Sequence, residues 1–445
     1  MFKYAKKFVG EAVITEVTNY LAKNPEKNIE TLINLVSKMA IRENHKKQIA
    51  SVSKYLSDKD SHWHKLFVTT LKETHPKVRE RFAVNFIINS VLSGIPKQYE
   101  LAEKLGYAVP WAILMDPTDR CNLRCKGCWA GEYLMKNDLP LELMDRIVSE
   151  GEELNIFFYL FSGGEPLIRK NDILKLAQKH PDSIFHIFTN GTLIDEKFAE
   201  ECLDAANITF AISIDGFEKA TDMRRGKGIF AKVMKAADIL RKQGLIFGFS
   251  TTYHRYNVDE ITSDEYIDML IDKGFRFGWL FTYVPVGSEA DVEFMATPQQ
   301  RAHAWKRIQE IRATKPILVA DFWNDGEFSG GCVAGGRRYF HINAAGDVEP
   351  CAFVHYSCAN IRSMSLKEAL GNPLFRAYQK RQPFNENHLR PCPLIDNPHE
   401  LVACVRESQA QCTQTVPTDP ERLASSLANY AAEWGKIADK MSKRI

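Results

Sequence analysis

Three cysteines, Cys121, Cys125 and Cys128, stand within one short stretch of the sequence in a C-x₃-C-x₂-C pattern. Thiolates carried by one loop can converge on a single metal centre. The spacing is neither that of a zinc finger, which combines two distant pairs of ligands, nor that of a bacterial ferredoxin. A [4Fe–4S] cluster held by three cysteines has one iron without a protein ligand, where a substrate or cofactor could bind. A zinc site or a ferredoxin-type site is the alternative.

The pattern directly follows a predicted strand and resembles that of the radical S-adenosylmethionine (SAM) superfamily. The resemblance implies that SAM chelates the open iron and is cleaved reductively to methionine and a 5′-deoxyadenosyl radical. It implies an enzyme of oxidoreductase type that abstracts a hydrogen atom from an unknown substrate, which is a peptide, a lipid or a small molecule. The alternative is a non-catalytic iron–sulfur or zinc-binding electron-transfer protein on the same scaffold.

Adjacent glycines and a glutamate, Gly163, Gly164 and Glu165, end the second predicted strand in the sequence Ser-Gly-Gly-Glu-Pro. Ligands of βα barrels bind at this edge of the strands, and glycines let the backbone approach a ligand closely. The stretch resembles the GGEP motif of the superfamily, which implies that the backbone and Glu165 receive the SAM ammonium group. A tight turn between strand and helix is the alternative for the glycines.

Three further residues are assigned to SAM by the same resemblance. Ser213 ends the fourth predicted strand and matches a serine that contacts the SAM carboxylate or ribose. Arg225, in Asp222-x-x-Arg225, matches an arginine that pairs with the SAM carboxylate, for which a guanidinium is suited. Arg224 is adjacent, so the register could differ by one. Trp129 matches an aromatic residue beside the adenine, with a core or rim position as the alternative.

A second set of cysteines lies toward the C-terminus. Cys332 and Cys351 bracket a predicted hairpin as C-x₁₃-G-x₄-C, with Gly346 between them, and Cys392 follows a helix predicted from Leu366 to Arg381. This arrangement resembles the auxiliary-cluster domains called SPASM and, in shorter form, twitch. The resemblance implies an auxiliary [4Fe–4S] cluster at these three cysteines.

The chain departs from a full SPASM domain, because the later closely spaced cysteines of such a domain are absent. We therefore predict one auxiliary cluster. Its fourth ligand is left open among Cys358, Cys404, Cys412 and the substrate. Zinc at the same residues, or buried cysteines without a ligand, is the alternative.

Short apolar runs alternate with helical patterns and must position these loops. Strands are predicted at Ala112 to Met115, Ile156 to Phe161, Ile184 to Phe188, Ile208 to Ile214, Leu245 to Phe249 and Phe277 to Phe281. The alternation predicts an α/β fold with a parallel sheet. Six units favour a partial (β/α)6 TIM-like barrel, because the interval is short of the ~250 residues of a closed one. An open doubly wound sheet would alternate in the same way.

The chain is predicted to divide into four parts. Residues 1–105 form a helical N-terminal region with one break at Gly94-Ile95-Pro96, and residues 106–315 form the radical SAM core. Residues 316–400 form the SPASM/twitch-like auxiliary region, and residues 401–445 form a helical tail.

Composition and charge exclude several classes of protein. The chain has 445 residues, of which 45% are hydrophobic and 26% are charged, so it is neither disordered nor collagen-like. A formal net charge of +2 gives no overall electrostatic footprint for nucleic acid. No apolar stretch is long enough to span a bilayer. We expect a cytoplasmic protein whose 10 cysteines stay reduced.

Partners are less closely defined by the sequence. Basic amphipathic stretches near the two ends, around Lys6 and Lys440, fit either an interfacial helix on anionic lipid or an ordinary packed helix. Peripheral membrane contact is thus one interpretation. The resemblance also implies an electron donor such as flavodoxin or ferredoxin. No catalytic hydrogen or proton donor is identified, and Tyr253, His254 and Tyr283 near strand ends are more typical of packing.

Overall fold

The computed structural model describes residues 53–131 and 137–443. A nine-stranded sheet organises them in the order β7-β6-β5-β4-β3-β2-β1-β8-β9. The strands are β1 (Ala112–Met115), β2 (Phe158–Phe161), β3 (Ile184–Thr189), β4 (Ile208–Ser213), β5 (Phe247–Tyr253), β6 (Phe277–Thr282), β7 (Leu318–Asp321), β8 (Tyr339–Ile342) and β9 (Val348–Glu349). Neighbouring strands are parallel except in the β8–β9 hairpin. A separate antiparallel pair joins β10 (Tyr356–Ser357) to β11 (Gln411–Cys412).

The strand order decides between the two predicted architectures. Strands β1 to β6 neighbour one another in chain order, whereas a doubly wound sheet would reverse its order at a switch point. The partial (β/α)6 barrel is therefore confirmed. Two further strands extend it: β7, which the sequence analysis missed, pairs with β6, and β8, the first strand of the predicted hairpin, pairs with the free side of β1. The predicted auxiliary region thus supplies both outer parts of the sheet, and the four-part division of the chain stays a prediction.

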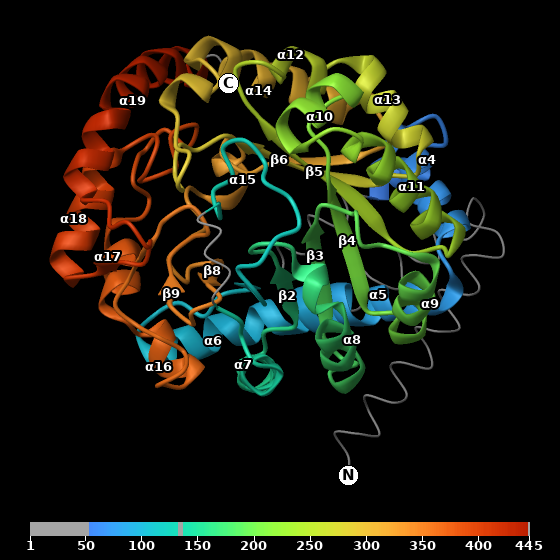
Figure 1. The fold of residues 1–445 in the computed structure, drawn as a ribbon, viewed down its shortest axis with the longest axis horizontal. Helices are drawn as coiled ribbons and strands as arrows, with labels where there is room; N and C mark the ends of the chain where they lie inside the picture. The colour runs from blue at the N-terminus through green and yellow to red at the C-terminus, as the bar shows by residue number, and fades with distance from the viewer. Residues whose placement is uncertain (1–52, 132–136, 444–445) are drawn as a thin grey trace.

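Helices surround the barrel strands, as Figure 1 shows. Those of the barrel are α7 (Leu141–Glu153), α8 (Lys170–Lys179), α9 (Glu196–Ala205), α10 (Glu218–Arg225), α11 (Ile229–Lys242), α12 (Val258–Ile261), α13 (Asp264–Asp272) and α14 (Pro298–Thr314). Short 3₁₀ turns, η2 (Pro166–Arg169) and η3 (Val292–Phe294), interrupt the loops. In α9, Cys202 is fully buried in the core.

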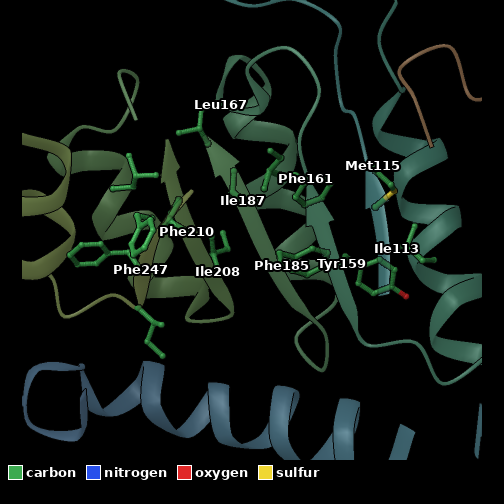
Figure 2. Close-up of a cluster of buried hydrophobic side chains, with 14 of the residues drawn as sticks. Ile113, Met115, Tyr159, Phe161, Leu167, Phe185, Ile187, Ile208, Phe210 and Phe247 are labelled. Atoms are coloured by element: carbon green, nitrogen blue, oxygen red, sulfur yellow. The ribbon is translucent and has the colours of Figure 1, made fainter. Parts of the chain in front are cut away.

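Each strand of the barrel has two apolar faces, because successive side chains point to opposite sides. Figure 2 shows part of the cluster between the sheet and its helices, including Ile113, Tyr159 and Phe161. The alternate residues Ala112 and Leu114 of β1, with their neighbours on β2, belong to a second cluster inside the barrel. Strands that are apolar on both faces are typical of a parallel sheet covered on both sides.

The N-terminal region is helical where it is described, in α4 (His62–Glu73), α5 (Pro76–Phe82), the π-helix η1 (Ala83–Gly94) and α6 (Ile95–Leu105). The predicted break at Gly94 is wrong, since η1 continues directly into α6. Gly94 instead permits close packing: a Cβ there would lie 2.9 Å from the carbonyl oxygen of Asn155. Pro96 occupies the first turn of α6, where its missing N–H is tolerated. The basic stretch around Lys6 lies outside the described residues.

These helices cover the amino ends of the barrel strands. The Asn85 amide donates to the carbonyl oxygens of Pro181 and Ser183, just before β3, at 2.9 and 2.8 Å. The Gln98 amide donates to the carbonyl oxygen of Asn155, just before β2, at 2.7 Å. Phe86 of η1 meets Phe158 edge-on, with ring centroids 5.4 Å apart. The N-terminal helices therefore close the end of the barrel opposite to the predicted site.

The auxiliary region follows the prediction with one correction. The hairpin is confirmed, with His341 opposite Glu349 and a left-handed Gly346 (φ +91°) in its loop. The helix predicted from Leu366 to Arg381 is two helices, α16 (Leu366–Leu370) and α17 (Pro373–Arg381). They separate because the Asn372 side chain accepts the Phe375 N–H and starts a new helix.

The tail contains α18 (Pro398–Ser408) and the long α19 (Pro420–Ser442). The apolar face of α19 is covered within the protein: Leu427 and Trp434 are fully buried, and the Trp434 indole donates to the carbonyl oxygen of Leu389 at 2.9 Å. The interpretation of this segment as an interfacial helix is thus wrong, because its apolar side chains already pack on α14 and α18. Within residues 53–131 and 137–443, no helix has the length and hydropathy needed to cross a bilayer.

Candidate active site

One cavity of about 380 Å³ lies inside the barrel and collects most of the predicted site residues. Its wall includes the three cysteines of the first motif and seven of the other residues considered: Trp129, Gly163, Gly164, Glu165, Ser213, Arg224 and Arg225. These residues come from the carboxyl ends of β1, β2 and β4 and the loops that follow. The rest of the wall is mainly aromatic and aliphatic.

The cysteine loop is held against the barrel by backbone contacts. The N–H of Lys126 donates to the carbonyl oxygen of Arg224 at 2.8 Å. Gly127 has φ +64°, and a Cβ there would lie 2.6 Å from the Tyr283 ring. Burial raises the pKa of Cys121 to about 12 and also raises the pKa of Cys128. Thiolates at this loop therefore need a bound cation, because burial alone favours the neutral thiols.

The Gly163-Gly164 turn lies directly against the start of the cysteine loop. Gly163 has φ +104°, and a Cβ on Gly164 would lie 2.1 Å from the carbonyl oxygen of Arg120. The Gly164 N–H donates to the carbonyl oxygen of Thr118 at 3.0 Å, and the Glu165 N–H donates to that of Arg120 at 2.7 Å. The glycines are therefore needed so that the β2 turn can pack on the loop that carries the cysteines.

Glu165 is buried, and its carboxylate is largely used inside the protein. It accepts the hydroxyl of Thr189 at 2.6 Å and the N–H groups of Asn190 and Leu167 at 2.8 and 3.0 Å. Burial raises its pKa, although these hydrogen bonds and Arg225 act in the opposite direction. The side chain thus joins the ends of β2 and β3 while still lining the cavity.

Both arginines of the predicted motif line the cavity and share one carboxylate. Arg224 and Arg225 donate to the same oxygen of the buried Asp215, at 2.9 and 2.6 Å. The other oxygen of Asp215 accepts the Thr252 N–H at 2.9 Å. Despite the effect of burial, the two guanidinium groups lower the pKa of Asp215. The Arg225 guanidinium also approaches the Cys125 sulfur at 3.9 Å.

The remaining predicted residues take different positions. Asp222 accepts the Phe230 N–H at 2.9 Å and thereby caps α11 rather than facing the cavity. Trp129 packs between rings of the auxiliary region, with Phe353 at 5.6 Å and His355 at 6.2 Å between centroids. Tyr253 and Tyr283 are buried outside the cavity, where Tyr253 accepts the Asn324 amide and Tyr283 accepts the Asp291 N–H.

The three distal cysteines are brought together beside this cavity. Cys332, Cys351 and Cys392 line a second, smaller cavity, and burial raises the pKa of each to about 12. The Tyr339 hydroxyl donates to the Cys351 sulfur at 2.7 Å. The two cavities share four wall residues, Phe322, Ser329, Val333 and Phe353.

The other three cysteines of this region lie outside the smaller cavity. Cys358 donates to the Asn372 side chain at 3.4 Å, so its thiol is directed to the start of α17. Cys404 is buried in α18, and Cys412 lies in β11 opposite Tyr356. In the described part of the chain, no three Cys, His, Asp or Glu side chains are arranged to hold a single metal ion.

A buried charged triad, missed by the sequence analysis, joins the barrel to the auxiliary hairpin. His341 of β8 lies 2.8 Å from Asp116 at the end of β1 and 2.7 Å from Glu349 of β9. The Asp116 carboxylate also accepts the hydroxyl of Ser162 at 2.8 Å. The two carboxylates outweigh the effect of burial and raise the pKa of His341 to about 10. The hairpin sets His341 opposite Glu349, and the parallel pairing of β8 with β1 adds Asp116, a contact that the spacing along the chain does not indicate.

Comparison with known proteins gives two matching family models. The radical SAM superfamily model matches residues 115–270, and the iron–sulfur cluster-binding domain model matches residues 332–393. The chain belongs to the radical SAM superfamily. Its cofactors are accordingly a [4Fe–4S] cluster and SAM, with auxiliary iron–sulfur in the second domain. The cavity fits this set, because the closely spaced thiols and the glycine turn line one common space.

The relatives of this radical SAM enzyme include named synthases and cyclases. The AdoMet-dependent heme synthase of Methanosarcina barkeri is 28% identical over 298 residues, covering 59% of this chain and 82% of the relative. The PqqA peptide cyclase of Granulibacter bethesdensis is 25% identical over 291 residues, covering 61% and 76%. The crystal structure of Streptococcus suis SuiB bound to S-adenosylmethionine shares the fold, with a TM-score of 0.55 and 17% identity over 76% of this chain and 86% of that one. The alternative of a non-catalytic electron-transfer protein is therefore not supported.

The triad gives a prediction of pH-dependent stability. Changing His341→Gln removes the cation that lies between two buried carboxylates and should lower the free energy of unfolding by roughly 3–5 kcal/mol at neutral pH. Because the folded pKa is about 10, above the unfolded value near 6.5, this contribution is complete below the unfolded pKa and is lost as the pH rises through about 10. Urea unfolding of both proteins across this range measures it.

His399→Gln is the matched control, because His399 forms an exposed ion pair with Glu400 at 3.5 Å. Its effect should stay below about 1 kcal/mol at every pH. Equal and pH-independent losses in both variants would contradict the charged state of His341.

Proposed function

We propose that this radical SAM enzyme abstracts a hydrogen atom from a substrate held in the barrel cavity. When bound, the cluster and SAM supply a 5′-deoxyadenosyl radical. The observation that supports the proposal is the single cavity, whose wall joins the cysteine triplet, the glycine turn and both arginines to a large apolar space. The protein provides orientation and keeps water from the radical.

The roles of the site residues follow from their positions. Cys121, Cys125 and Cys128 ligate the cluster, and Arg225 adds a positive charge beside Cys125. Two groups of cavity-wall residues hold SAM: the turn residues Gly163, Gly164 and Glu165, and the side chains of Ser213, Arg225 and Trp129. One carboxylate oxygen of Glu165 accepts only the Asn190 N–H among described residues, so it can accept a further hydrogen bond. This oxygen would receive the SAM ammonium group.

Cys332, Cys351 and Cys392 ligate one auxiliary cluster. The wall that the two cavities share supports a role for this cluster in exchanging an electron with a substrate radical. Cys358 is bonded to Asn372 and so is a weak candidate for the fourth ligand. The Tyr339 hydroxyl, by donating to the Cys351 sulfur, stabilises the thiolate form of this ligand.

The proposal needs a one-electron donor, of the class of flavodoxin or ferredoxin. It leaves a peptide, a lipid and a small molecule as substrate classes. SuiB has been solved with its precursor peptide SuiA, and the Methanosarcina relative is named for heme synthesis. We also retain the division of the chain at residues 105, 315 and 400 as the arrangement of its functional parts.

Replacing Cys121, Cys125 and Cys128 together with alanine should abolish formation of 5′-deoxyadenosine, because no thiolates remain for the first cluster. The distal cluster should persist and be visible by its absorbance. Cys202→Ala, in the core of α9, is the control and should retain cleavage of SAM after anaerobic reconstitution and reduction. Cleavage by the triple variant would refute the assignment.

Arg225→Ala should weaken SAM binding by about 1.5–3 kcal/mol, the scale of a hydrogen bond to a charged group. Arg224→Ala is a matched control, because each variant leaves Asp215 with one arginine. Equilibrium dialysis with SAM measures the difference between them. If only Arg224→Ala weakens SAM binding, Arg224 and not Arg225 binds SAM. If both variants lose thermal stability equally and keep their SAM affinity, the two arginines have a structural role.

Iron analysis tests the auxiliary cluster. Two cubane clusters give about eight irons per chain, and replacing Cys332 and Cys351 with alanine should reduce this to about four. Cys358→Ala should retain about eight, since its thiol is directed to Asn372. A wild-type value of about four would mean that the distal cysteines hold no cluster, and about twelve would mean that the remaining cysteines hold another.

A further inference from the structure

The cavity extends well beyond the space beside the SAM residues. Its wall continues down the inner face of the strands to Ala112 and Phe158, which lie opposite each other in the β1–β2 register. Phe158 precedes Ser162 of the glycine turn by four residues, so the cavity follows about 13 Å of strand. Phe86 and Trp111 pack against Phe158 at this lower end.

The lower part of the cavity is apolar. Its inner wall is formed by Ala112, Leu114, Phe158, Leu160, Trp279 and Phe281. A peptide backbone placed there would bury N–H and C=O groups without partners, at a cost of about 1–3 kcal/mol each. A hydrocarbon chain has no such groups and gains free energy from every methylene that it buries. The wall therefore selects against a peptide in this part of the cavity.

The cavity reaches the surface beside β7 and β8. Phe328 of α15 (Gly326–Ser329) lines it and is 75% exposed. Arg338, directly before β8, also lines it, and its guanidinium lies over the Tyr99 ring at 5.3 Å from the centroid. Within residues 53–131 and 137–443, no acidic side chain forms a salt bridge with Arg338. The lower opening thus combines an exposed aromatic ring with a cation that remains available to an anionic group.

We infer that the substrate is an amphiphile with an extended hydrocarbon chain, which lies in the barrel with its anionic head at Arg338 and its chain directed to the SAM site. The inference rests on the proposed function, which identifies the end of the cavity where SAM binds. The C–H bond that breaks then belongs to a chain carbon remote from the head group, and its hydrogen atom is transferred to the 5′ carbon of the deoxyadenosyl radical. A carbon-centred radical remains on the chain.

A tetrapyrrole is the main competing apolar ligand. Its several carboxylates would need several cations, and the charged groups of the described wall are few. Arg224 and Arg225 form ion pairs with Asp215, and Asp325 is paired with Arg312. Arg338 alone is available among the described wall residues, which suits one anionic head.

Isothermal titration calorimetry tests the inference. The reconstituted protein with SAM bound is titrated with octanoate, decanoate, dodecanoate or tetradecanoate, each below its micellar concentration. The affinity should rise roughly tenfold for each added pair of methylenes until the cavity is full. Ala112→Phe, which fills the cavity beside Arg338, should weaken the binding of every acid in the series. Ala428→Phe on the exposed face of α19 is the control and should leave it unchanged.

Arg338→Gln should weaken dodecanoate by about tenfold and leave dodecanol unaffected, since only the acid carries a charge. The chain-length series on the wild-type protein keeps the test decisive if Ala112→Phe does not fold. An affinity that is independent of chain length overturns the inference. The inference is also overturned if hemin binds more tightly than every acid and loses affinity in Ala112→Phe.

Cleavage of SAM by the wild-type protein, measured in parallel, tests the proposed function separately. Cleavage without chain-length-dependent binding overturns the assignment of the substrate alone. Binding of the acids without cleavage overturns the proposed function and leaves the assignment of the cavity in place.

Discussion

The site depends on the pairing of β1 with a parallel strand on each side. On one side β2 brings the Gly163-Gly164 turn against the loop of Cys121, and on the other side β8 brings the auxiliary hairpin. The second pairing is fixed by a buried histidine between two carboxylates, His341 with Asp116 and Glu349. A buried charged group of this kind is costly to separate from its partners. Both iron–sulfur regions are therefore held in one register around a single strand.

This arrangement puts the two cysteine sets at two adjoining cavities. Phe322 and Phe353 belong to the walls of both cavities, so no separate layer of secondary structure lies between them. The inner faces of the barrel strands carry apolar side chains that line a cavity and do not fill the barrel. The same alternation that buries Ile113 and Tyr159 under helices on the outside exposes Ala112 and Phe158 to the cavity on the inside.

Much of the fold was predictable because it is encoded locally. The six barrel strands are short apolar runs between helical patterns, and the hairpin is marked by Gly346. The cysteine sets could be found from spacing and resemblance. Strands β7 and β8 joined the barrel sheet through contacts between distant segments, which periodicity does not report. The triad of His341 and the sharing of Asp215 by two arginines could not be found for the same reason. The helix continues through Gly94, where a break was predicted, because a close tertiary contact with Asn155 outweighs the low helix propensity of glycine.

The π-helix η1 contributes one aromatic ring, Phe86, to the closed end of the barrel. That ring lies outside both cofactor-binding regions and packs on Phe158, at the end of the cavity remote from the cysteines. For an amphiphile whose head group is anchored at this end, the carbon attacked is determined by its distance from the anchor and is not recognised by the groups around it. A change in the volume of a single side chain at this end would then move the reaction from one carbon to another while the chemistry at the other end stays the same.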